Sequence, residues 1–114
     1  MEALLLTPEG NEMPAFFCKL VPPRASFAQD MSPEEAQAMQ AHGVYWRGLL
    51  AGGKVVVFGL VGDPRGAFGV GIIEVDDPTE AKRMTDEDPA ILAGHGHHYE
   101  IHPMPFGAVS RPKA

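Results

Sequence analysis

Residues 54–75 read KVVVFGLVGDPRGAFGVGIIEV, and this stretch determines the predicted fold. Its two β-rich runs, Lys54 to Val61 and Phe68 to Val75, flank the segment 62–66, whose Asp-Pro-x-Gly order is typical of a type I turn. The stretch therefore predicts an antiparallel hairpin. Both runs are apolar on both faces, whereas a sheet with one solvated face normally alternates polar and apolar residues. We therefore expect both faces of the hairpin to be covered.

Helix-start signatures lie on either side of the hairpin. In Ser32-Pro33-Glu34-Glu35 the serine is a good N-cap, the proline suits the first turn and the second glutamate completes a capping box. This predicts a helix that runs to Gly52-Gly53. Asp77-Pro78-Thr79-Glu80 repeats the pattern and predicts a shorter helix, which must stop near Asp88 because Pro89 disfavours helical geometry before it.

Two further strands complete the pattern, at residues 14–21 and 98–103. The order βαββαβ predicts an α+β chain with a ferredoxin-like fold and a four-stranded antiparallel sheet over residues 14–104, preceded by an N-terminal extension (1–13) and followed by a C-terminal tail (105–114). No sequence is left to cover the second face of this sheet. A second copy of the chain is the simplest cover, so we expect a homodimer.

Composition limits the partners of this 114-residue chain. The formal charge of −6, without a basic stripe, argues against nucleic acid as a partner. Cys18 is the only cysteine, so no disulfide can form within the chain, and we expect its thiol to be buried. No apolar run is long enough for a signal peptide or a membrane span. These features predict a cytoplasmic protein that does not associate with membranes and whose partner is a small-molecule ligand.

The first candidate for chemistry is His42. At a period of 3.6 residues it falls within an apolar arc of the first helix that also includes Met39, Trp46, Leu49 and Leu50, with Tyr45 at its edge. A buried imidazole is costly unless it finds a hydrogen-bond partner. His42 is therefore either a structural histidine bonded to a carbonyl oxygen or a catalytic or ligand-binding residue.

The second candidate is Asp88, which follows Met84 by four residues and so points toward the apolar side of the second helix. At a helix C-terminus the macrodipole disfavours a carboxylate, which would make Asp88 a better proton acceptor. The alternative is a solvated acidic turn.

Other polar groups are weaker candidates. Imidazoles two residues apart on an extended chain can point to one side, so His95, His97 and His98 form either a metal site or a solvated loop. No cysteine or acidic partner stands at ligand spacing, and we expect no metal. Arg24 is either a receptor for a substrate carboxylate or a surface arginine. No dinucleotide fingerprint and no nucleophile elbow is present, so we expect no cofactor and no serine hydrolase.

The chain also resembles a known family. The matching segments are MQAHGVYWRGLLAGGK (39–54), VVVFGLVGDPRGAFGVGIIEVDDPTEA (55–81), DEDPAILAG (86–94) and YEIHP (99–103). Their order is similar to that of the YCII-related proteins, small relatives of the dimeric α+β barrels. The resemblance implies a His-Asp dyad near a dimer interface, formed here by His42 and Asp88. It also implies links to muconolactone-isomerase-like proteins and to a dehydrochlorinase of hydroxylated aromatic compounds.

Two functions follow as hypotheses. The first is a cofactor-independent lyase or isomerase that moves a proton on a small cyclic or aromatic acid, with His42 as acid or base and Asp88 fixing its tautomer. Tyr45, Trp46 and Phe58 would line its apolar wall and Arg24 would bind the substrate carboxylate. The second is a non-catalytic dimeric module that binds a small ligand or a protein.

Overall fold

The structure is a computed structural model that describes residues 14–109. It contains four strands and four helices in an order that includes the predicted βαββαβ pattern and two additional short helices. In chain order the elements are β1 (Ala15–Val21), α1 (Phe27–Asp30), α2 (Pro33–Ala51), β2 (Val55–Val61), β3 (Phe68–Ile73), α3 (Pro78–Asp86), α4 (Pro89–Leu92) and β4 (His98–Met104).

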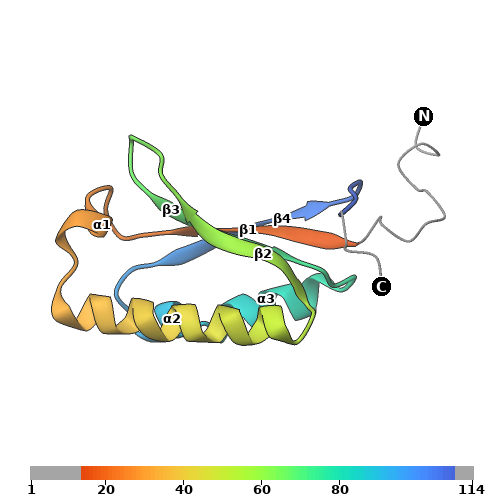
Figure 1. Cartoon of the computed structure of the whole chain (residues 1–114), viewed down its shortest axis with the longest axis horizontal. Coiled ribbons are helices and arrows are strands. Elements are labelled where there is room, and N and C mark those ends of the chain that lie inside the picture. The colour runs from red at the N-terminus through yellow and green to blue at the C-terminus, as the bar shows by residue number, and fades with distance from the viewer. Residues whose placement is uncertain (1–13, 110–114) are drawn as a thin grey trace.

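The strands form one antiparallel sheet in the order β2-β3-β1-β4. The first and last strands of the chain, β1 and β4, are therefore neighbours, and β2 and β4 are the two edge strands. The helices α2 and α3 lie against one face of this sheet (Figure 1). The predicted α+β class and ferredoxin-like arrangement are therefore confirmed. No helix within residues 14–109 is long and apolar enough to cross a membrane.

Local signals start the helices where the sequence predicts. The Glu35 amide donates to Ser32 Oγ at 3.1 Å and the Ser32 amide donates to Glu35 Oε1 at 2.8 Å, which is the predicted capping box. Asp77 caps α3 by accepting from the Thr79 amide at 2.9 Å. In the hairpin, the Gly66 amide donates to the Asp63 carbonyl at 2.9 Å and closes the predicted turn.

The role of Asp88 in the helices differs from the prediction. The helix ends at Asp86, and Asp88 is the N-cap of α4. The interpretation of Asp88 as a helix C-terminal residue is therefore wrong: its carboxylate faces the favourable end of the next helix dipole. The apolar arc of α2 is also narrower than predicted, because Leu50 is 42% exposed while Trp46 is 1% exposed.

Trp46 is the centre of the core between α2 and the sheet. A Cβ added at Gly71 in β3 would lie only 2.5 Å from the Trp46 indole, so this strand position admits no side chain beneath the ring. Cys18, beside Gly71 in β1, is fully buried as expected, and burial raises the pKa of its thiol to about 12. The close approach of α2 to the sheet sets the depth of the site described below.

The opposite face of the sheet carries a second set of apolar side chains, which we call the open face. Strand pairing places its members beside one another and away from α2 and α3. Val57 at the centre of β2 is 51% exposed and Val61 is 36% exposed. The apolar members are Phe17, Val21, Val57, Val61, Phe68, Val70 and Ile72.

Candidate functional site

The site begins with His42, which α2 holds above the sheet. Its side chain is 17% exposed and lines a cavity of about 260 Å³. Most of the other residues that line the cavity are apolar, among them Phe27, Met31, Met39, Phe58 and Leu60. A cavity of ~150 Å³ with apolar walls holds a benzene ring, so this one has room for a small cyclic molecule.

Asp88 lies next to His42 and is fully buried. His42 Nδ1 lies 2.8 Å from Asp88 Oδ2. The same oxygen accepts a hydrogen bond from Trp46 Nε1 at 2.9 Å and another from the Tyr99 hydroxyl. The second carboxylate oxygen, Oδ1, accepts from the Ala90 amide at 2.8 Å. The carboxylate thus receives donors from α2, β4 and the first turn of α4.

These donors determine the protonation state of Asp88. Burial alone would raise its pKa, but the hydrogen bonds from His42 and Tyr99 outweigh burial and hold the pKa of this carboxyl below its ordinary value. Burial, and then the adjacent Asp88 charge, raise the pKa of the Tyr99 phenol. At neutral pH the pair is therefore a carboxylate and a neutral phenol, and Asp88 can only accept from its neighbours.

The ionised carboxylate defines the orientation of the histidine. With Asp88 as acceptor, the proton of a neutral His42 ring lies on Nδ1, and Nε2 is the basic nitrogen. Within residues 14–109, Nδ1 is the ring nitrogen of His42 that is hydrogen-bonded to protein. An imidazole oriented by a buried carboxylate, with one nitrogen free at a cavity, can accept or donate a proton.

The predicted wall residues divide into two groups. Phe58 lines the cavity. Trp46 donates a hydrogen bond from its indole nitrogen to Asp88. Tyr45 donates from its hydroxyl to the Met84 carbonyl at 2.5 Å. Trp46 and Tyr45 therefore support the dyad and anchor α2 on α3, and they do not line the cavity.

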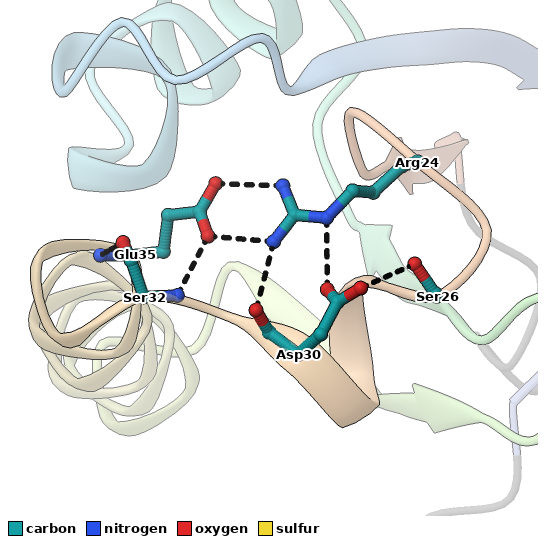
Figure 2. A network of polar contacts seen from close by, with 5 residues as sticks. All are labelled: Arg24, Ser26, Asp30, Ser32 and Glu35. Carbon is teal, nitrogen blue, oxygen red and sulfur yellow. Dashed lines mark hydrogen bonds and ion pairs between the residues drawn. The ribbon is translucent and has the colours of Figure 1, made fainter.

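Arg24 is engaged elsewhere. Its guanidinium lies between two carboxylates, as Figure 2 shows. Nη1 and Nη2 donate to Glu35 at 2.9 and 2.8 Å, and Nε donates to Asp30 at 2.8 Å. The Arg24 bonds lower the pKa of Glu35 to about 2. Because its donors are occupied and it does not line the cavity, we leave Arg24 out of the ligand site.

The three histidines of the tract do not point to one site. His97 lines the cavity and packs its ring at 89° to Phe27, with 4.7 Å between the centroids. His98 is exposed in β4, 3.8 Å from Glu100. Among residues 14–109 no group of three or more histidine, cysteine, aspartate or glutamate side chains is placed to hold a metal ion.

Sequence reasoning missed two residues of the site, Tyr99 and His97. Tyr99 lies in the predicted strand at 98–103, but its alternation pattern gave no sign that its hydroxyl would reach Asp88. His97 was included only in a metal tract, because two histidines flanking it suggested shared ligation. Neither residue shares a helix face with His42, and only the packing of β4 against α2 brings them to it.

Comparison with known proteins identifies the family of the chain. Neither the curated proteins nor the solved structures include a significant match to the chain. The YCII-related domain, in contrast, matches residues 15–105, a range that spans all four strands, both long helices and the His42–Asp88 pair. The chain therefore belongs to the YCII-related domain family.

Proposed function

We propose that the protein is a cofactor-independent enzyme of the lyase or isomerase type, which moves a proton on a small cyclic or aromatic molecule. The observation that carries the proposal is the 2.8 Å contact between His42 Nδ1 and the buried Asp88 carboxylate, at the wall of an apolar cavity. In this mechanism Nε2 of His42 takes a proton from the bound molecule. Asp88 stabilises the positive charge that then develops on the ring.

The apolar wall contributes to the same reaction. Because Phe27, Met39 and Phe58 make the surroundings of the cavity apolar, a charge that forms on the substrate would interact more strongly with the imidazolium than it would in bulk solvent. The proton then returns to a different atom of the substrate in an isomerase, or a leaving group departs in a lyase.

Deuterium exchange tests this proposal without a known substrate. We would incubate the protein in D₂O with a panel of monocyclic ketones and lactones and follow by NMR the loss of the C–H signals next to the carbonyl. General base catalysis typically contributes about 10²–10⁴-fold, so His42→Gln is expected to lower the exchange rate of an active compound at least 100-fold.

The matched control is His98→Gln, because His98 is exposed and lies outside the cavity. Its exchange rate should equal that of the unmodified protein. Equal rates for His42→Gln, or no acceleration of any compound, would contradict the enzyme proposal.

A second candidate is a non-catalytic module that binds a small ligand. It is favoured by the hydrogen bonds from Trp46 and Tyr99 to Asp88, since these give the buried carboxylate a structural role in joining α2 to β4. This alternative would be supported if a compound binds in the cavity but the protein accelerates deuterium exchange in none of the compounds tested.

We also propose that two copies pair through the open face. This surface contains seven apolar side chains in adjacent strands, and large apolar patches of this kind mark protein interfaces. Isologous pairing of the two sheets would cover both patches at once. The single buried thiol of Cys18 is consistent with a reducing compartment, and we propose the cytoplasm.

A further inference from the structure

His97 is the second polar side chain of the cavity. It lies in the loop between α4 and β4, whereas His42 lies on α2, so the two imidazoles reach the cavity from different elements. The other residues that line the cavity are apolar or glycine. A bound molecule thus meets polar protein side chains at these two histidines.

The ring of His97 is unusual because both of its nitrogens are buried and neither has a hydrogen-bond partner within residues 14–109. A buried polar group without a hydrogen-bond partner is energetically unfavourable, and proteins usually avoid such groups. The ring does contact Phe27, but an aromatic face is at best a weak acceptor. The fold therefore buries the nitrogens of this imidazole without giving them a hydrogen-bond partner within residues 14–109.

The backbone holds His97 in that place. Gly96 has a φ of +102°, a conformation that other residues rarely adopt, and a Cβ there would lie 3.1 Å from Pro23 Cβ. The loop is thus packed closely on the segment after β1. The backbone of His97 is therefore held at the cavity, although within residues 14–109 its ring nitrogens have no hydrogen-bond partner that would explain its position.

We propose that His97 is a ligand-binding residue, which hydrogen-bonds an uncharged hydroxyl or carbonyl group of the molecule held against His42. This inference rests on the proposed function, because it places the ligand in the same cavity. Protein atoms cover both nitrogens, so the ring must turn about its side-chain bonds to meet the ligand.

The charge of the surroundings selects the class of ligand. Within residues 14–109 no arginine, lysine or carboxylate lines the cavity, and Arg24 is bound to Asp30 and Glu35. Burial, and then the nearby His42, lower the pKa of His97, so that at neutral pH its ring is an uncharged donor and acceptor. A carboxylate would lose its hydration without meeting a cation, which is unfavourable. The ligand is therefore expected to be neutral rather than the acid that the sequence suggested.

The test compares phenol, toluene and benzoate, which share one ring and differ in the attached group. Binding would be measured by NMR titration, with the imidazole nitrogens of His97 observed directly. One neutral hydrogen bond contributes about 1 kcal/mol, so the unmodified protein is expected to bind phenol about fivefold more tightly than toluene, and benzoate most weakly. Phenol should shift the His97 nitrogen signals, and toluene should not.

The diagnostic variant is His97→Phe, which keeps a ring against Phe27 but removes both nitrogens. It should bind toluene as before, which shows that the cavity is intact, and should lose the preference for phenol. His98→Gln is the control and should keep that preference. An unchanged preference in His97→Phe, tighter binding of benzoate, or no binding of phenol and toluene to the unmodified protein would overturn the inference.

The two proposals can fail separately. If phenol selectivity depends on His97 but deuterium exchange is the same in His42→Gln, the ligand site stands and the enzyme proposal fails. If deuterium exchange depends on His42 while His97→Phe leaves the preference for phenol unchanged, the enzyme proposal stands and the role of His97 in ligand binding fails.

Discussion

At the residue scale, the depth of the site depends on one position without a side chain. The Trp46 indole lies directly over Gly71, and this contact lets α2 approach the sheet closely enough for Trp46 Nε1 and His42 Nδ1 to reach the same carboxylate oxygen. A larger residue at position 71 would push the indole away from Asp88.

Gly71→Ala should therefore destabilise the protein. Atoms closer than 3.0 Å must move, and overpacking of this kind typically costs about 1–3 kcal/mol. Urea denaturation measures the loss, and fluorescence of the single tryptophan reports whether the indole has moved. Gly59→Ala in β2 is the matched control, because a Cβ there has no atom within 4 Å and should change stability by less than about 0.5 kcal/mol. Equal effects of the two substitutions would show that the contact at Gly71 is not close in solution.

At the element scale, the ion-pair network of Arg24 joins three segments. Arg24 follows β1, Asp30 ends α1 and Glu35 lies in the first turn of α2 (Figure 2). Because Phe27 of α1 and Met31 after it line the cavity, the network fixes one wall of the site. Arg24 thus helps to position one wall of the cavity without lining it.

This network predicts how stability depends on pH. The pKa of Glu35 is about 2 in the folded protein and 4.5 ordinarily, so its stabilisation is complete above pH 4.5 and is lost as the pH falls toward 2. Glu35→Gln should therefore be less stable than the unmodified protein at pH 7, and the difference should shrink below pH 4.5 and vanish near pH 2. Thermal unfolding across this range measures it. Glu34→Gln, at the exposed neighbouring position, is the control. A difference that is constant with pH would contradict the assignment.

At the scale of the whole molecule, the sheet has two unlike faces. One packs on α2 and α3, and the open face displays apolar side chains over β1, β2 and β3. The cavity lies between α2 and the strands, and among the seven apolar residues of the open face Phe68 is the one that also lines it.

The dimer proposal predicts that a charge at the centre of the open face separates the copies. The unmodified protein should sediment with twice the mass of one chain, and Val57→Glu should shift it to the monomer, because pairing would bury the new carboxylate. Val44→Glu is the control: Val44 is 71% exposed, but on α2. Circular dichroism would show that both variants fold. A single-chain mass for the unmodified protein would refute the dimer.

The sequence by itself determined the features that depend on neighbours along the chain. The helix N-caps, the hairpin turn and the strand pattern are local, and they predicted the order βαββαβ correctly. The helix period also placed His42 on the buried side of α2. The stop of α3 near Asp88 was predicted as well, but the start of α4 at Pro89 was missed, because a proline both disfavours helix in the residue before it and suits the first turn of a new helix.

Only the tertiary structure decided which polar groups meet. The bonds of Asp88 to His42, Trp46 and Tyr99 join residues far apart in the chain, and no local pattern encodes them. The same is true of Arg24, which the fold pairs with Glu35 although its sequence context also suited a substrate carboxylate. In the described part of the chain, tertiary packing likewise leaves the nitrogens of His97 without hydrogen-bond partners. Secondary structure follows from short-range backbone preferences, whereas a site depends on long-range contacts that exist only once the helices have packed on the sheet.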